Sequence, residues 1–355
     1  KAFYCTYYFS PINMKYRLLS GLALLLLSCS TTEPEITQFL PTVITGEFVD
    51  YQQYPNTRKV VAEGPVYWSG NLATDSIADD GSFRLAFDLY APEEITLKPF
   101  IYTYVNVEPG DSLHLVIKID DGAGVEFSGD RAAYNNELYT FHNGGFIEEW
   151  GGQKSALKRL GLNDALTYLG SFYEIDTTRL NEFIEAKSPA PELVASLSAY
   201  LLNRHFGLLF EHGMERQRED LQAVKPDTEG YFRAVASQFR SHLPTLKKHP
   251  RFKQTMFTYN SYFAYHKLHG PFHKLITDPE DYPTYHEIVE LEEDPDLQQA
   301  LLFSFGETLL DIGKPDAFTT FWDGISTELR KGAEMKKLYQ LYLHNAPVSE
   351  AAPAS

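Results

Sequence analysis

Cysteine is almost absent from this sequence of 355 residues, which contains only Cys5 and Cys29. No Cys-x-x-Cys occurs in it, so these residues hold neither a dithiol redox centre nor a cysteine zinc site. The sequence also lacks a Walker lysine loop, a Gly-x-Gly-x-x-Gly and a Gly-x-Ser-x-Gly. It therefore offers no motif for nucleotide binding or for a serine hydrolase, and it implies no cofactor.

Basic residues are scarce beside acidic ones, with 31 Lys and Arg against 48 Asp and Glu and a net charge of -17. Binding to a polyanion needs clustered basic side chains that release counterions, so nucleic acid is not an expected partner. The content of 43% hydrophobic and 14% aromatic residues predicts a globular chain with a sizeable core.

A lipoprotein signal peptide is predicted before Cys29. Lys15 and Arg17 are followed by the apolar residues 18–27 and then by Ser28-Cys29. This run is too short for a membrane-spanning helix, which needs about 20 apolar residues. A cysteine directly after small and aliphatic residues is the position that receives the lipid, so we expect Cys29 to be the lipidated first residue of the mature chain.

The predicted anchor also suggests where the protein is placed. Ser30 follows Cys29, where an aspartate would favour retention in the inner membrane, so we expect lipid anchoring in the cell envelope at the outer membrane. We interpret residues 1–28 as upstream sequence plus signal peptide, and residues 29–41 as a tether.

The pattern of residues 42–129 predicts an antiparallel β-sandwich domain. Short runs of Val, Ile, Tyr and Phe alternate with polar residues and are separated by turn formers such as Asp79-Asp80-Gly81. Strands are expected over 42–49, 65–69, 75–78, 82–89, 94–97, 101–107, 112–119 and 124–128.

Helical periodicity replaces this alternation over residues 130–344, which predicts an all-α domain and an α+β fold overall. The tail 345–355, rich in Ala and Pro, is expected to be a linker or a frayed end. Helices are expected over 132–142, 154–169, 178–186, 191–212, 228–242, 251–269, 294–312, 315–325 and 327–344.

The most concentrated polar cluster holds three imidazoles, those of His266, His269 and His273. His266 and His269 would share a helix face, and a zinc or copper site would need a fourth ligand such as Asp278 or Glu280. A surface or packing role at the end of an aromatic helix is the alternative.

A second histidine motif, His286-Glu287-Ile288-Val289-Glu290, resembles the zinc-protease His-Glu-x-x-His. Glu290 replaces the second ligand, so no zinc protease is expected.

Several short motifs at predicted turns are similar to those of a known protein family. Asp80-Gly81-Ser82-Phe83 precedes a strand, 107–113 reads Val-Glu-Pro-Gly-Asp-Ser-Leu, and Phe127-Ser128-Gly129-Asp130 precedes Ala132 and Asn135-Asn136. Residues 29–136 thereby resemble the N-terminal region of the TlpA-like thiol-disulfide oxidoreductases, lipoproteins of the thioredoxin superfamily. On physical grounds these phrases are turns, with Ser128-Gly129-Asp130 expected to cap the first helix.

The resemblance implies a β-domain, a helical region and then a thioredoxin domain that carries the catalytic Cys-x-x-Cys. No matching catalytic position exists in this chain, so the expected function is that of a membrane-tethered accessory region, with the thioredoxin domain predicted after Ser355. Two alternatives stay open: a stand-alone outer-membrane lipoprotein that binds a glycan or a protein, and a metalloprotein that uses the three histidines.

Overall fold

The structure is a computed structural model that describes residues 38–53, 58–64, 71–98, 104–118, 124–144, 155–220, 228–268 and 272–345. Contacts group Thr37–Ser355 into one compact unit. The predicted signal peptide, Cys29, most of the tether and the tail 346–355 lie outside the described residues.

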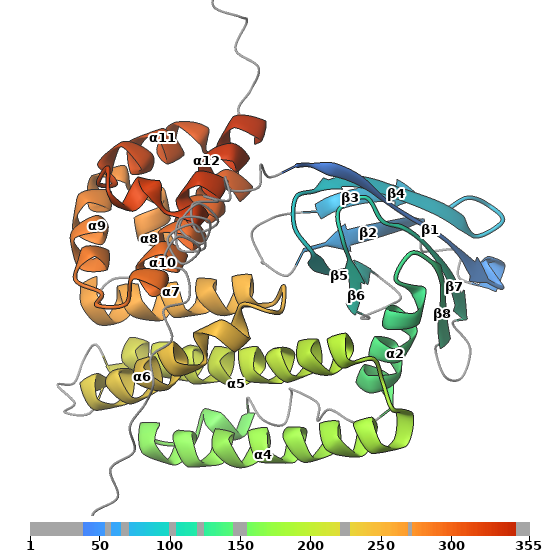
Figure 1. Cartoon of the computed structure of the whole chain (residues 1–355), viewed down its shortest axis with the longest axis horizontal. Helices are drawn as coiled ribbons and strands as arrows, with labels where there is room; N and C mark the ends of the chain where they lie inside the picture. Colours follow the sequence, from blue (N-terminus) through green and yellow to red (C-terminus); the bar gives the residue numbers. More distant parts are fainter. Residues whose placement is uncertain are drawn as a thin grey trace, which may run out of the picture. The chain divides into compact units, whose positions relative to one another are not determined.

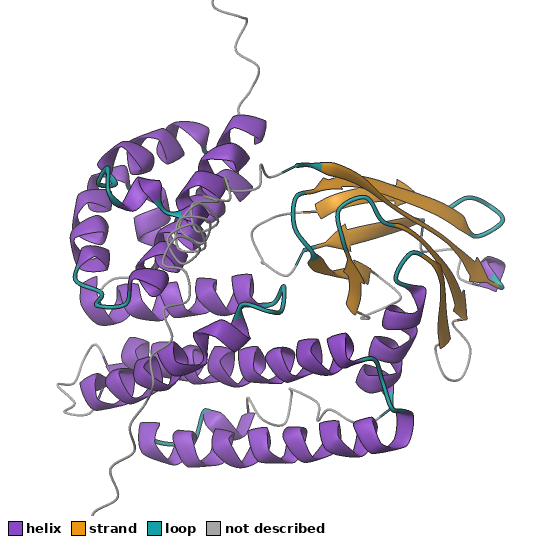
Figure 2. Cartoon of the chain, viewed as in Figure 1, coloured by secondary structure: helices purple, strands orange, loops and turns teal. Residues whose placement is uncertain are grey.

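The fold class is α+β, as predicted, and strands and helices are segregated along the chain (Figures 1 and 2). Two four-stranded sheets have the orders β4-β1-β7-β8 and β3-β2-β5-β6. Neighbouring strands are antiparallel apart from the parallel pair β1 and β7. The strands are β1 (Leu40–Val49), β2 (Lys59–Glu63), β3 (Asn71–Ser76), β4 (Ser82–Leu89), β5 (Glu93–Lys98), β6 (Tyr104–Val107), β7 (Ser112–Lys118) and β8 (Gly124–Gly129).

Alternation explains why these strands form a sandwich. In β4 every second side chain, from Phe83 to Leu89, is buried, and the side chains between them are exposed. The preceding turn depends on Gly81, whose φ of 88° is unfavourable for other residues, and on Asp80, which accepts a hydrogen bond from the Ser82 N–H at 3.0 Å. The period of two thus places one face of each strand in the core between the sheets.

Helix α2 (Ala132–Asn143) covers an edge strand of each sheet. The Asn135 amide accepts from the Asn106 N–H at 2.8 Å and donates to the Asn106 carbonyl at 2.9 Å, on β6. Asn136 makes the same pair of bonds with Phe127 on β8, at 3.1 and 3.0 Å. Two adjacent side chains therefore act like strand backbone at the edges of both sheets.

We expect Asn135→Leu to lower the free energy of unfolding by about 2 kcal/mol, because it leaves the buried N–H and C=O of Asn106 without partners. Urea unfolding measures the change. Asn143→Leu is the control, because the exposed Asn143 amide bonds, within the described ranges, only to the Tyr139 carbonyl of its own helix. An equal effect of the two substitutions would contradict the proposed role of Asn135.

The start of α2 differs from the prediction. The residue before the helix is Arg131, which has a φ of 52° and makes no capping hydrogen bond with its side chain. Asp130 instead accepts a hydrogen bond from the Ser112 N–H at 2.8 Å. The prediction that Ser128-Gly129-Asp130 caps this helix is therefore wrong, because the carboxylate is used to hold β7.

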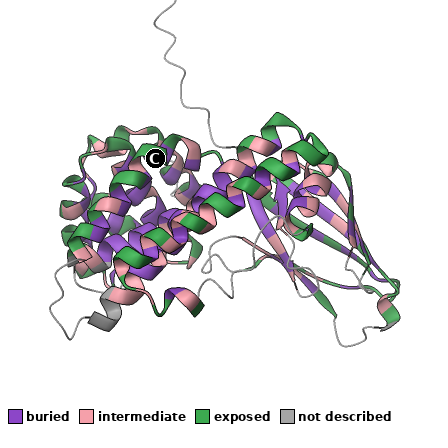
Figure 3. Ribbon diagram, turned by 90° about the horizontal axis from the view of Figure 1, so that it is seen from below, coloured by how far each residue is buried: buried purple, intermediate pink, exposed green. Residues whose placement is uncertain are grey.

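The helical part is built around α5, which packs against α4, α6 and α7, while α10 packs against α7 and α12. The inner faces of these helices are buried (Figure 3). The helices are α4 (Leu162–Lys187), α5 (Pro191–Asp220), α6 (Thr228–Leu246), α7 (Phe252–Leu268), α8 (Phe272–Thr277), α9 (Tyr282–Glu290), α10 (Pro295–Asp311), α11 (Pro315–Gly324) and α12 (Ala333–Asn345).

Helix α5 is long and apolar enough over Pro191–Arg216 to cross a membrane, yet 67% of its most apolar window is buried inside the protein. Its side chains supply much of the helical core, including Phe206 and Phe210. This composition is therefore that of a central packing helix.

Helix α4 is continuous, so the predicted break between 169 and 178 is wrong. The run crosses Gly170, although glycine inside a helix costs about 1 kcal/mol relative to alanine. Ala165, Leu169, Leu180 and Phe183 keep one buried face along the helix, and this packing offsets the cost.

Candidate functional site

Charged residues are buried where the sandwich meets the helices. Glu93 and Glu94 begin β5, and their exposed fractions are only 6% and 2%. They lie beside the turn from α6 to α7, which supplies His249 and Arg251, and beside Lys253 in the first turn of α7. Buried carboxylates need cations or hydrogen bonds, so this pairing explains why the turn docks against β5.

The first of two polar networks is centred on Lys253. Its Nζ is paired with the carboxylate of Glu93, lies 3.1 Å from Glu307 Oε1 on α10, and donates to the Tyr90 hydroxyl at 2.9 Å. The Tyr90 hydroxyl in turn donates to Glu307. Four side chains, from the β4–β5 connection, β5, α7 and α10, thus form one connected network of hydrogen bonds and ion pairs.

Protonation of Lys253 follows from these contacts. Burial alone would lower the pKa of Lys253, but the carboxylates of Glu307 and Glu93 raise it well above its ordinary value. Burial also raises the pKa of Glu93, and Lys253 opposes that change. Lys253 therefore stays an ammonium group near neutral pH and is not available as a general base or as an amine nucleophile.

The second network holds Glu94, His249 and Arg251. The Arg251 N–H donates to Nδ1 of His249 at 3.1 Å, so Nδ1 carries no proton and a neutral His249 has its proton on Nε2. That Nε2 lies 3.3 Å from Oε2 of Glu94. Burial and then the Arg251 charge lower the pKa of His249 to about 3, while burial raises the pKa of Glu94 to about 7.

The guanidinium of Arg251 joins three elements. It lies 4.7 Å from the ring centroid of Tyr200 on α5 and 5.1 Å from that of Tyr104 on β6. It also donates to the Tyr104 hydroxyl at 3.3 Å. Stacking of a desolvated guanidinium on two aromatic rings is a favourable arrangement, so Arg251 fastens α7 to both the helices and the sandwich.

His142 on α2 completes this cluster. Its ring lies 5.0 Å from Tyr200 and 5.1 Å from Tyr104, and its buried Nε2 has no hydrogen-bond partner within the described part of the chain. Burial, and then the Arg251 charge, lower its pKa to about 3. The imidazole is therefore held neutral.

We expect His142→Phe to make the protein less sensitive to acid. Below its ordinary pKa of 6.5 the unfolded chain binds a proton at His142 that the folded chain does not, so stability falls as pH decreases from 6.5 towards 3. This loss amounts to about 2 kcal/mol by pH 5. Buried His249 and His286 titrate in the same way in every variant, so the loss between pH 7 and pH 5, measured by thermal or urea unfolding, should be about 2 kcal/mol smaller in His142→Phe than in the wild type. A His114→Phe control should match the wild type. A loss in His142→Phe as large as in the wild type would contradict the assignment.

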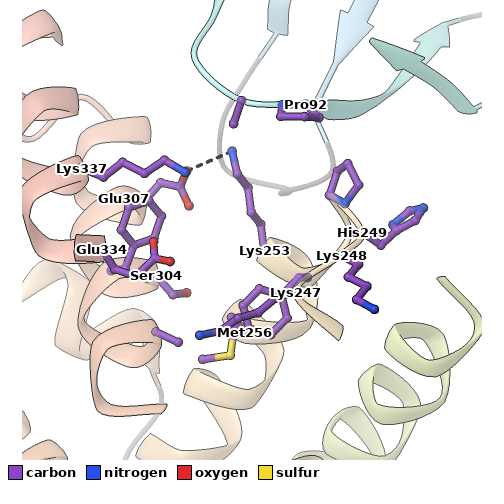
Figure 4. Close-up of a pocket in the computed structure, with 15 residues that line it drawn as sticks. Pro92, Lys247, Lys248, His249, Lys253, Met256, Ser304, Glu307, Glu334 and Lys337 are labelled. Atoms are coloured by element: carbon purple, nitrogen blue, oxygen red, sulfur yellow. Dashed lines mark ion pairs between the residues drawn. The ribbon is translucent and has the colours of Figure 1, made fainter. Parts of the chain in front are cut away.

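A cavity of about 250 Å³ opens beside the Lys253 network (Figure 4). Its wall is formed by the β4–β5 connection, the turn between α6 and α7, and helices α7, α10 and α12. It is lined by Ala91, Pro92, Lys247, Lys248, His249, Pro250, Phe252, Lys253, Met256, Ala300, Phe303, Ser304, Glu307, Glu334 and Lys337.

The chemistry of this region favours binding over proton transfer. Lys253 is held protonated, and both nitrogens of His249 face fixed neighbours. Neither side chain is therefore free to accept a proton from a substrate. What the arrangement offers is a fixed set of charges next to an apolar cavity.

The residues of the predicted metal site are only partly described. Nε2 of His266 lies 2.6 Å from Oε2 of Glu229, and its ring stacks on Phe232 at 4.1 Å. His269 lies outside the described residues, and the side chain of His273, in α8, is not described. No group of three or more metal-binding side chains occurs among the described residues, and the site stays a prediction.

His286, the start of the zinc-protease-like motif, lies on α9. Its ring packs 5.0 Å from Phe321, and burial lowers its pKa to about 4. It has a packing role between α9 and α11.

The acidic and basic residues of the junction were not predicted as a site. The available signal was the pair Glu93-Glu94 at the start of an apolar strand and the alternation His249-x-Arg251-x-Lys253 where an apolar helix begins. Charges inside apolar stretches indicate buried pairs, but the sequence does not show which charges meet.

Comparisons with protein-family models, curated proteins and solved structures gave no match to this chain.

Proposed function

We propose that this chain is the membrane-tethered accessory region of a thiol-disulfide oxidoreductase, anchored through a lipid on Cys29 and itself without the Cys-x-x-Cys centre. The motifs that resemble the TlpA-like lipoproteins support this proposal. In that family the β-domain and the helical region precede the reductase domain, and this chain has the same order of elements.

One contact carries the structural argument. The ring of Phe39, just before β1, stacks on the ring of His344, near the end of α12, with centroids 3.5 Å apart and planes 6° from parallel. The end of the predicted tether, where Phe39 lies, and the last described helix are therefore side by side. A domain following α12 would be attached close to the point where the lipid tether arrives.

The buried junction adds to this argument. The networks around Lys253 and Arg251 connect the sandwich to α5, α7 and α10 through charged groups with fixed partners. Separating the two parts would expose or strand these charges, which is costly. A rigid accessory region can hold a following reductase domain at a defined distance from the membrane.

The test of the oxidoreductase assignment is to read the coding sequence after the codon of Ser355. A Cys-x-x-Cys in the same frame, within roughly 100 codons, the size of one domain, is the expected result. A stop codon directly after Ser355 would overturn the assignment and leave the stand-alone binding lipoprotein, with a glycan or protein ligand, as the function to test.

The anchor is tested separately, by growing expressing cells with radiolabelled palmitate. The wild-type chain should incorporate label and sediment with membranes. Cys29→Ser should do neither, and Cys5→Ser, which lies upstream of the predicted cleavage site, should behave as the wild type. Labelling of the Cys29→Ser variant would contradict the anchor.

A further inference from the structure

We infer that the cavity between the β4–β5 connection and helices α7, α10 and α12 binds a small amphipathic anion, that is, a carboxylate or phosphate on a short aliphatic or aromatic body. This site is independent of the proposed function, because it needs neither the lipid anchor nor a following domain. The size of the cavity, its apolar wall and its charge all fit such a ligand (Figure 4).

The volume of the cavity limits the ligand to a small molecule. About 250 Å³ is just below the usual range for ligand pockets, which is roughly 300 to 1,000 Å³. Since a water molecule occupies roughly 30 Å³ in the liquid, the space corresponds to about eight such groups. A ligand of about ten non-hydrogen atoms therefore fits, while a folded peptide segment or an oligosaccharide does not.

The wall of the cavity is mainly apolar. Pro92 of the β4–β5 connection lies across the cavity from Met256 of α7 (Figure 4), and Phe303 and Ala300 of α10 also line it. A polyol would lose its hydration there without enough polar partners to replace it. An alkyl chain or an aromatic ring gains by leaving water.

The charge that remains available at the cavity is positive. Glu307 is already engaged by Lys253 and Tyr90. Lys337 of α12 makes no ion pair within the described part of the chain, and its Nζ lies over the rings of Tyr90 and Phe303, 5.2 and 5.6 Å from their centroids. Contact with aromatic faces positions an ammonium group without neutralising it, so Lys337 can still pair with an anion.

Two further groups favour an anionic head group. Among the residues that the structure describes, Lys247 has only a distant partner, Asp296 at 3.7 Å, whose side chain is 79% exposed. The hydroxyl of Ser304 lines the cavity and makes no hydrogen bond with another described residue, so it can donate to a bound oxygen. Glu334 is the one lining carboxylate besides Glu307, and the lysines outnumber it.

The test is isothermal titration calorimetry of the purified chain with octanoate, pentyl phosphate and octylamine. Each probe has about ten non-hydrogen atoms, the size that the cavity admits, and the three differ in the head group. We expect at least one anion to bind with a stoichiometry of one, and octylamine to bind at least about tenfold more weakly. The stronger of the two anions identifies the head group as carboxylate or phosphate.

Substitutions locate the binding site. Lys337→Gln should weaken binding of the preferred anion by about tenfold, whereas Lys336→Gln, on the exposed face of the same helix, should leave it unchanged. Ala300→Phe should abolish binding by filling the cavity. Circular dichroism and thermal unfolding show whether each variant is folded, and Lys337→Gln replaces a partly exposed side chain, so it tests the site even if Ala300→Phe does not fold.

Three results would overturn the inference. The first is that neither anion binds. The second is that octylamine binds as tightly as the anions, which would leave only an apolar cavity without charge selectivity. The third is that Lys336→Gln and Lys337→Gln weaken binding equally, which would place the anion on the general surface of α12.

Discussion

Replacing Lys253 with methionine is expected to lower the free energy of unfolding by about 3 to 5 kcal/mol. The side chains of Glu93 and Glu307 are only 8% and 11% exposed, and both are paired with Lys253. Methionine has a similar length but no charge, so both carboxylates lose their cation while they stay buried. The cost comes mainly from these stranded anions and less from the loss of the pair itself.

Urea unfolding at neutral pH measures this effect. Lys336→Met is the matched control, because Lys336 is exposed on α12 and makes no ion pair within the described residues. A triple variant with Lys253→Met, Glu93→Leu and Glu307→Leu should recover most of the lost stability, since it removes the stranded charges as well. A loss below about 1 kcal/mol in Lys253→Met, as for an exposed pair, would show that the network contributes little.

The second large effect concerns Glu94 and is a dependence on pH. The folded chain holds the Glu94 proton up to about pH 7, whereas the ordinary pKa is 4.5. Between these values the folded state binds more protons than the unfolded state, so the stability of the wild type falls as pH rises through this window. Complete titration corresponds to about 3 kcal/mol.

Glu94→Gln removes this titration and keeps the shape of the protonated side chain. We expect the variant and the wild type to be similarly stable at pH 4.5, and the variant to be more stable by about 3 kcal/mol at pH 8.5. Titrating groups that do not interact with Glu94 are common to both proteins and cancel in the difference, whereas its neighbours Glu93 and His249 titrate together with it in the wild type. A difference that stays constant from pH 4.5 to 8.5 would show that Glu94 titrates as it does in the unfolded chain.

Much of the sandwich could be predicted because its strands are buried on one face only. In β4 the alternation of Phe83, Leu85 and Phe87 with Arg84 and Ala86 gives the correct strand from end to end. Strand β2 was missed because Lys59–Glu63 is short and only two of its side chains, Val60 and Ala62, are buried. The strand predicted at 65–69 lies outside the described residues.

Helices were predicted well where one buried face is regular and less well where a local signal opposed it. The predicted break between 169 and 178 begins at Gly170, but the packing of α4 against α5 keeps the helix continuous there. Helix α9 was not predicted, because Tyr282–Glu290 is short and begins with a proline next to acidic residues that resemble a loop. Tertiary contacts decide such segments, and they are not visible in the local sequence.

The junction and its cavity could not be predicted for a different reason. Glu93 and Lys253 are 160 positions apart, and Tyr90 and Glu307 are 217 positions apart. Each residue alone looks like an ordinary surface charge in an acidic protein. Whether such residues form buried pairs depends on contacts between distant parts of the chain, which a single sequence does not specify.

The stacking of Phe39 on His344 also affects how the chain can be rearranged. The start of β1 and the end of α12 lie close together. A short linker could therefore join these two ends while new termini are made in another loop, and the whole unit could be inserted into a loop of another protein with little strain. The region from β1 to α12 is therefore suited to circular permutation and to insertion as a domain into another protein.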